Sequence, residues 1–186
     1  MTTMNRKTVA LAAVFGAVLT AGPATAFAQL STAANGPYYA TPSWDQKLTT
    51  NRFVILANWN SEAVLDRETG LVWEKKPKDS LADLSFSALS CHLTSTGGRR
   101  GWRLPRAEEL SSLLQPDASG MATLPDGHPF EEVRTYSGAS YWSATRSLAS
   151  TSAMWVVSFR NGAGGPSSAA SHHFWCVRGG QGADAQ

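Results

Sequence analysis

The stretch from Gly97 to Leu110 constrains the fold more than any other part of the chain. Two adjacent glycines at its start allow a bend that other residues resist. Trp102 and Leu104 then alternate as in a short strand, and Pro105 ends the strand because proline donates no hydrogen bond to a sheet. The three leucines between positions 110 and 114 have the spacing of one helix face. The stretch therefore predicts a loop, a strand end and a helix start in close succession.

The N-terminus has the pattern of a secretory signal peptide over residues 1–28. Arg6 and Lys7 precede a mostly apolar run over 9–19, and small residues at Ala26 and Ala28 offer a cleavage site. The run is too short to span a bilayer comfortably, although an uncleaved N-terminal anchor is the alternative. We expect a secreted or periplasmic protein of the bacterial cell envelope, with no transmembrane segment after cleavage.

Removal of this segment changes the charge balance. The full chain has 16 Lys and Arg against 14 Asp and Glu, and two of the basic residues lie within 1–28, which leaves 14 of each sign. A formal net charge of zero gives no electrostatic case for nucleic acid as a partner. The remaining length of about 158 residues suffices for one domain with its own core.

Two cysteines, Cys91 and Cys176, remain in the exported part. Because disulfides persist in oxidising compartments, a single disulfide is the default interpretation, and two buried free thiols are the alternative.

The rest of the chain divides into an arm or linker over 29–50, a domain over 51–180 and a flexible tail over 181–186. Residues 29–50 are rich in Ala, Thr, Ser and Pro, which is typical of a linker or a loosely docked arm.

Within the domain, one helix is expected to begin at a Ser85 cap, with Phe86, Leu89 and Leu93 on one stripe and Cys91 on its flank. The other helix follows Pro105. Residues 115–140 read as a long loop pinned by two apolar side chains, and strands are expected at 52–56, 63–65, 71–74, 141–144, 154–160 and 172–178.

Several short sequence motifs, called phrases here, occur one after another along the chain. The ordered set is more specific to one family than any single phrase is. The phrases are Asp66 followed by Thr69-Gly70-Leu71-Val72-Trp73, Cys91 after a helix, Gly101-Trp102-Arg103-Leu104-Pro105, Glu109-Leu110, Tyr141-Trp142-Ser143, Trp155-Val156-Val157-Ser158-Phe159, and Cys176-Val177-Arg178-Gly179. Over about residues 53–180 this set resembles the bacterial family named for the C-terminal domain of the collagen-like adhesin Lcl.

The resemblance implies an α+β domain with a C-type-lectin-like fold, in which two helices pack on small twisted antiparallel sheets. It also implies a disulfide between the first helix and the last strand, where Cys91 and Cys176 stand. Family members often carry Thr or Ser directly after the Arg-Leu-Pro phrase, as a helix cap. Here Arg106 holds that position, and its side chain cannot accept amide hydrogen bonds.

Eight residues of these phrases are interpreted as structural. Arg103 and Arg178 are expected to be at least half buried and bonded to carbonyls and to Glu109 or Asp66; ligand binding by these arginines is the alternative. The eight are Trp73, Trp102, Arg103, Leu104, Pro105, Glu109, Trp142 and Arg178.

A ligand surface is expected on the late strands and loops, the face that commonly binds ligands in this fold. Aromatic side chains beside small polar residues make rigid but adaptable contact surfaces. The candidates are Trp175, His173, His172, Arg160, Tyr141 and Arg146. No metal or cofactor is expected, because Asp184 is the only acid after position 132 and the adjacent His172 and His173 point to opposite faces of a strand.

Three functions are consistent with this pattern. The first is an exported, non-catalytic module that binds a glycan or protein ligand without calcium, as in adhesion. The second is a structural or assembly domain of an envelope complex, a role that is compatible with a homo-oligomer of this chain. The third is an oxidase of the formylglycine-generating kind, whose fold and Arg-Leu-Pro phrase are similar; it requires free thiols that a disulfide would remove.

Overall fold

The computed structural model describes residues 33–34, 51–150 and 152–180. The predicted signal over 1–28, most of the 29–50 arm and the 181–186 tail lie outside the described residues. The described part is an α+β domain with two α-helices and small, mainly antiparallel sheets, which confirms the expected class. Its helices are α1 (Leu84–Leu93) and α2 (Ala107–Ser112), with 3-10 turns η1 (Ala57–Trp59) and η2 (Thr96–Gly98).

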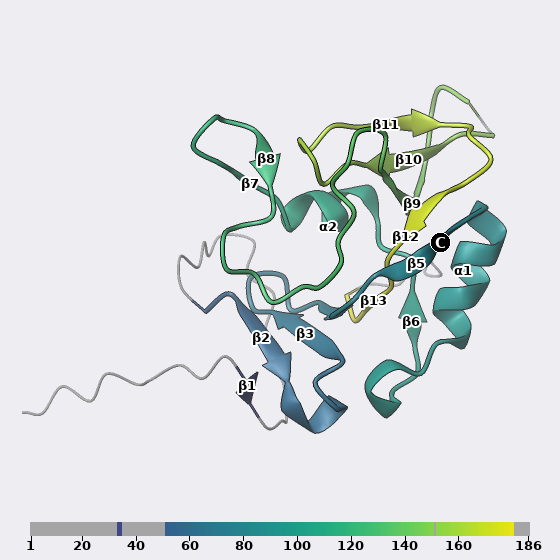
Figure 1. The fold of residues 1–186 in the computed structure, drawn as a ribbon. Coiled ribbons are helices and arrows are strands. Elements are labelled where there is room, and N and C mark those ends of the chain that lie inside the picture. Colours follow the sequence, from purple (N-terminus) through teal and green to yellow (C-terminus); the bar gives the residue numbers. More distant parts are fainter. Residues whose placement is uncertain (1–32, 35–50, 151, 181–186) are drawn as a thin grey trace, which may run out of the picture.

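The first sheet has six strands in the order β1-β2-β3-β4-β13-β6 and forms the lower part of Figure 1. Its strands are β1 (Ala33–Ala34), β2 (Phe53–Leu56), β3 (Ala63–Asp66), β4 (Val72–Glu74), β13 (Val177–Arg178) and β6 (Trp102–Arg103). The strands predicted at 63–65 and 71–74 pair as the β3–β4 hairpin, with a polar tip between them. Asp66 closes the tip, because its carbonyl accepts from the Gly70 amide and its carboxylate accepts from the Thr69 hydroxyl.

The second sheet has five strands in the order β11-β10-β9-β12-β5. They are β5 (Lys78–Ala82), β9 (Tyr141–Arg146), β10 (Met154–Val157), β11 (Gly164–Ser167) and β12 (His172–Phe174). The two end strands of this sheet, β5 and β11, were not predicted. An edge strand can form through backbone hydrogen bonds to its one neighbour, whatever its side chains. The charged sequence of β5 and the Gly-Gly-Pro of β11 therefore do not have the residue pattern that predicts a strand.

The segment 115–140 is irregular apart from a short hairpin of β7 (Gln115–Pro116) and β8 (Ala122–Thr123), at the upper left of Figure 1. Leu124 and Phe130 are buried and pin the segment, as expected.

Two core clusters lie on opposite faces of the segment that runs from β12 to β13. Trp175 and Val177 belong to one cluster, and Phe174 and Cys176 belong to the other. Successive side chains from 174 to 177 therefore alternate between the two faces, although residues 175 and 176 interrupt the strand expected at 172–178. Because both faces are covered, residues 173–177 of this segment are buried.

The disulfide between Cys91 and Cys176 is present, with the two Cα atoms 5.4 Å apart. It sets the rotation of α1, since successive residues turn by about 100° around a helix. Leu89 and Leu93 stand about 160° from Cys91, and Phe86 stands about 140° from it. The apolar stripe is consequently exposed, while Ser87 and Cys91 face the core, so Cys91 lies opposite the stripe and not on its flank as expected.

The start of α1 differs from the sequence interpretation, whereas the start of α2 agrees with it. Asp83, not Ser85, caps α1, and its carboxylate accepts from the Phe86 amide at 2.8 Å. At α2 the Arg106 side chain provides no cap, as its chemistry requires. The Thr145 hydroxyl of β9 accepts from the Ala107 amide at 2.9 Å in its place. A cap supplied from another strand ties α2 to the second sheet.

Candidate functional site

Three of the six expected ligand contacts are buried, which is a correction to the sequence interpretation. Trp175 and Tyr141 have no exposed surface, and His173 is 4% exposed. These side chains are buried because core clusters cover both faces of the segment from β12 to β13 and both faces of the start of β9 beside it. The ring of Trp175 packs edge-on against Trp73 and Phe130, and its indole donates to the Glu74 carbonyl. No ligand reaches these side chains at the surface.

The rings of Tyr141 and His173 lie side by side in this core, with their centroids 5.6 Å apart, and each makes a hydrogen bond to another residue. The Tyr141 hydroxyl accepts from the Arg134 amide at 2.6 Å, and burial raises the pKa of this phenol to about 12. His173 Nε2 shares a hydrogen bond of 2.7 Å with the Tyr136 hydroxyl, while its Nδ1 is buried without a partner. Burial, and then the charge of Arg134, lower the pKa of His173, so the neutral imidazole is favoured.

His172 is half buried and holds two serine hydroxyls. Its Nδ1 lies 2.9 Å from Ser140 Oγ and its Nε2 lies 2.8 Å from Ser167 Oγ. Burial lowers its pKa, and the neighbouring His173 lowers it further. Both ring nitrogens are thus occupied in linking the start of β9 to β11. Within the described residues no carboxylate bonds to His172, so the Ser-His-carboxylate arrangement of a hydrolase is absent there.

Arg160 and Arg146 are exposed, and they lie in different surroundings. Arg146 ends β9. Arg160 follows β10 and lines a hollow of about 500 Å³, called here the loop hollow. In the described part of the chain, no acceptor is bonded to the Arg160 guanidinium. Of the six expected contacts, Arg160 is the one that borders this hollow.

The loop hollow has an apolar floor and a polar rim. Buried Leu124, Phe130 and Phe159 line its inner side. His128 Nδ1 accepts from the Phe130 amide at 3.2 Å, which leaves the N–H of a neutral ring on Nε2. Burial lowers the pKa of His128, against the raising effect of Asp126. The complete lining is Thr123, Leu124, His128, Phe130, Glu132, Val133, Thr135, Phe159 and Arg160.

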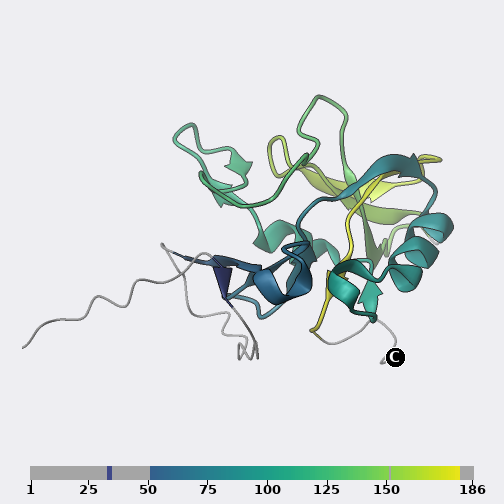
Figure 2. The same cartoon turned by 60° about the horizontal axis from the view of Figure 1, so that its bottom comes forward.

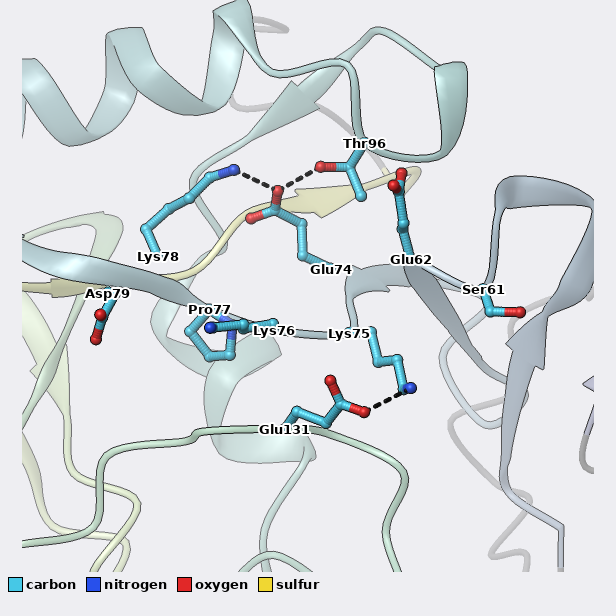
Figure 3. A pocket seen from close by; sticks show the side chains of 10 residues that line it. All are labelled: Ser61, Glu62, Glu74, Lys75, Lys76, Pro77, Lys78, Asp79, Thr96 and Glu131. Atoms are coloured by element: carbon cyan, nitrogen blue, oxygen red, sulfur yellow. Dashed lines mark hydrogen bonds and ion pairs between the residues drawn. The ribbon is translucent and has the colours of Figure 1, made fainter.

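A second hollow of about 460 Å³, called here the lysine hollow, opens where β4 leads into β5 (Figure 3). Its centre is the buried Glu74, whose Oε1 accepts from Lys78 Nζ at 2.7 Å and from Thr96 Oγ1 at 2.6 Å. Glu74 Oε2 is buried without a partner. Glu62 lies beside it and accepts from the Gly97 amide at 2.7 Å. The donors and acceptors of this hollow are largely bonded to one another, so it is mainly a structural network.

A row of ion pairs joins the two hollows. Lys75 pairs with Glu131 at 2.6 Å, Lys76 pairs with Glu132 at 2.6 Å, and Arg134 pairs with Asp79. The Glu131 amide also donates to the Lys75 carbonyl. Segment 131–134 is therefore fastened along the β4–β5 connection, with one hollow on each side.

Arg103 and Arg178 have the carbonyl and carboxylate partners that a structural role requires. Arg103 pairs with Glu109 and donates to the Gly179 carbonyl at 2.7 Å. Arg178 donates to the Arg100 carbonyl at 2.8 Å. Asp66, by contrast, pairs with the buried Arg52, which the sequence interpretation did not consider. Trp73, Trp102, Leu104, Pro105 and Trp142 are buried.

The described residues offer few reactive groups. The structure leaves no free cysteine thiol in them, since both cysteines are in the disulfide. No group of three or more His, Cys, Asp and Glu in this part of the chain is placed to hold a metal ion. None of its helices is long and apolar enough to cross a membrane.

These features define a class: a small α+β domain, closed by one disulfide, that presents open polar hollows on irregular loops. The family comparison places the chain more narrowly. It belongs to the Lcl C-terminal domain family, whose model matches residues 62–178. Neither the curated proteins nor the solved structures contain a match to this chain.

Sequence reasoning missed most of the residues around the two hollows. His128, Glu132 and Lys76 lie in polar stretches without periodicity, and the ion pair of Lys76 with Glu132 joins residues far apart in the chain. A partial signal existed in the length of segment 115–140, because long irregular segments in compact domains are often functional. The charge pattern of 74–79 had no motif that would mark it.

Proposed function

We propose that the chain is an exported, non-catalytic binding module with a C-type-lectin-like fold, and that it recognises a glycan in the loop hollow without calcium. The observation that carries this proposal is the exposed Arg160 guanidinium, which has no partner within the described residues and borders an apolar floor. A planar fork of donors suits carboxylate, sulfate or vicinal hydroxyl oxygens, and an apolar floor suits the carbon face of a sugar ring.

Two further observations support the fold and the absence of catalysis in this proposal. The disulfide joins the first helix to the residue before the last strand, and β2, β3, β4 and β13 share one sheet, as the C-type-lectin-like arrangement requires. Both cysteines are bonded to each other, so the oxidase alternative lacks the thiol it needs. The signal pattern of residues 1–28 supports export.

The test uses the chain recovered after export from a bacterial host. Glycan-array binding is measured with and without a chelator, and the affinity for the best glycan is then determined by calorimetry. Arg160→Ala is expected to weaken binding by about tenfold or more, since a hydrogen bond to a charged group contributes about 1.5–3 kcal/mol. Arg146→Ala removes another exposed arginine, outside the hollow, and is expected to bind as the unchanged chain does.

Two outcomes contradict the proposal. If Arg160→Ala binds the glycan with unchanged affinity, the loop hollow is not the site. If binding disappears in chelator, calcium takes part. A second candidate function, a structural domain of an envelope assembly, is favoured by one observation: a helix face of large apolar side chains without cover in the described residues.

A further inference from the structure

Helix α1 presents large apolar side chains to solvent. Phe86, Leu89 and Leu93 are 56%, 55% and 60% exposed, and Leu81, two residues before the Asp83 cap, is 57% exposed. Figures 1 and 2 both show α1 at the edge of the domain, with no described element on its outer side. Single exposed leucines are ordinary, but a continuous apolar stripe of this kind marks an interaction surface.

The charge of this stripe restricts its partner. Residues Leu84–Leu93 contain no Asp, Glu, Lys or Arg. A membrane surface or a polyanion would be recognised by basic side chains along the helix, which are absent from α1. A neutral apolar face instead suits an equally neutral apolar face, and a second copy of this chain supplies one.

The positions along α1 are self-complementary in an antiparallel pair. Phe86 and Leu93 lie two helical turns apart, and Leu89 lies near the midpoint between them. A two-fold axis through that midpoint places Phe86 of each copy against Leu93 of the other, and the two Leu89 side chains together. Such an isologous contact closes after two copies.

The ends of the helix also fit this orientation. The exposed Asp83 stands at the N-terminus of α1, and the exposed His92 stands in its last turn. An antiparallel pair places the acidic N-terminal end of each helix beside the C-terminal half of the other and opposes the helix dipoles favourably. A parallel pair would place like ends together.

We infer that two copies of this chain associate through the α1 stripe, with the two helices antiparallel. The four exposed side chains are those of Phe86, Leu89 and Leu93 on α1 and of Leu81 on β5. Together they expose on the order of 400 Å² per copy, taking about 200 Å² for each full side chain. The pair then buries roughly 800 Å² of apolar surface plus its rim, below the about 1,200 Å² of a standard stable interface. The dimer is therefore weak, with a dissociation constant on the order of 100 µM.

Sedimentation velocity on the exported chain, from about 10 µM to about 1 mM, tests the association. The weight-average mass of the unchanged chain is expected to rise toward two copies. Leu89→Glu, and separately Leu93→Glu, are expected to remain monomeric, because each places two buried carboxylates at the contact. Both positions are more than half exposed, so folding is retained, and circular dichroism verifies this. Leu148→Glu makes the same change at an exposed leucine outside the stripe and is expected to dimerise normally.

Crosslinking tests the orientation. Variants Ser85→Cys and His92→Cys, both at exposed positions, are mixed in equal amounts and treated with a short bis-maleimide. Antiparallel helices give mainly mixed Ser85→Cys with His92→Cys products, whereas parallel helices give mainly products of one variant with itself. The inference is overturned by a monomer over the whole concentration range, by Leu89→Glu dimerising as the unchanged chain does, or by products of one variant predominating.

Discussion

Arg103 and Glu109 are joined by two parallel hydrogen bonds of 2.8 Å, and the same carboxylate accepts a third from the Arg106 amide at 2.8 Å. One acidic side chain in the first turn of α2 thereby holds the end of β6, the start of the helix and, through Arg103, the Gly179 carbonyl after β13. The Arg-Leu-Pro phrase is consequently a structural joint, in agreement with the interpretation of Arg103 from the sequence.

Replacing Glu109 by Gln is expected to lower the free energy of unfolding by about 2 kcal/mol, because a largely buried guanidinium loses its counter-charge and one of its paired acceptors. Urea denaturation of the purified chain measures this. The matched control is Glu108→Gln, next along α2, whose side chain is 58% exposed and whose contact with Arg106 is 3.9 Å long. It is expected to change stability by less than about 0.5 kcal/mol. Equal effects of the two changes would contradict the structural role of Glu109.

The extent to which the sequence predicts this fold depends on how local each constraint is. The β3–β4 hairpin and α2 follow from turn chemistry and apolar spacing within a few residues, and both are present where expected. The stripe of α1 was predicted with Cys91 on its flank, whereas Cys91 and the buried Ser87 lie on the opposite side of the helix. The disulfide decides the rotation, and no periodicity within the helix reveals that.

The candidate site was less predictable for a related reason. Trp175 and Tyr141 were interpreted as surface residues, because aromatic side chains beside serines and histidines are typical of contact surfaces. Their burial results from two core clusters on opposite faces of one segment, which is a property of the whole fold. Arg160 and Arg146, by contrast, were expected at the surface and are exposed.

Removal of the disulfide is expected to destabilise the domain strongly. The bond closes a loop of 85 positions in sequence, for which the chain-entropy model gives an upper value of about 4–5 kcal/mol. The double variant Cys91→Ala with Cys176→Ala leaves no unpaired thiol and should unfold at a much lower temperature, measured by circular dichroism. A reductant should lower the unfolding temperature of the unchanged chain and have no effect on the double variant. Equal unfolding temperatures of the two proteins would show that packing alone closes the domain.

The two glycines of η2 should respond differently to alanine. Both have positive φ, +64° at Gly97 and +68° at Gly98, so each change carries a backbone cost of about 1–2 kcal/mol. At Gly97 an added Cβ would lie 2.6 Å from the Trp59 Cβ, whereas at Gly98 it meets nothing within 4 Å. Gly97→Ala is therefore expected to be the more destabilising by a further 1 kcal/mol or more, roughly the lower end of the cost of overpacking. Chemical denaturation of both variants checks this, and equal losses would mean that Trp59 moves aside freely.

His173 is expected to make the stability of the domain depend on pH. Burial and the charge of Arg134 lower its pKa in the folded state, so the folded chain binds fewer protons at this site than the unfolded chain does. Its contribution is complete above the unfolded pKa of about 6.5, and is lost as the pH falls through the lower folded value. His172 has a pKa shifted in the same direction and adds to the slope. Unfolding temperatures measured between pH 7.5 and pH 5 should therefore fall less steeply for His173→Phe, which removes the titration and keeps a ring in the site. His92→Gln, which removes an exposed histidine on α1, is the control. A slope that is identical in the unchanged chain and in His173→Phe would assign the acid sensitivity to other groups.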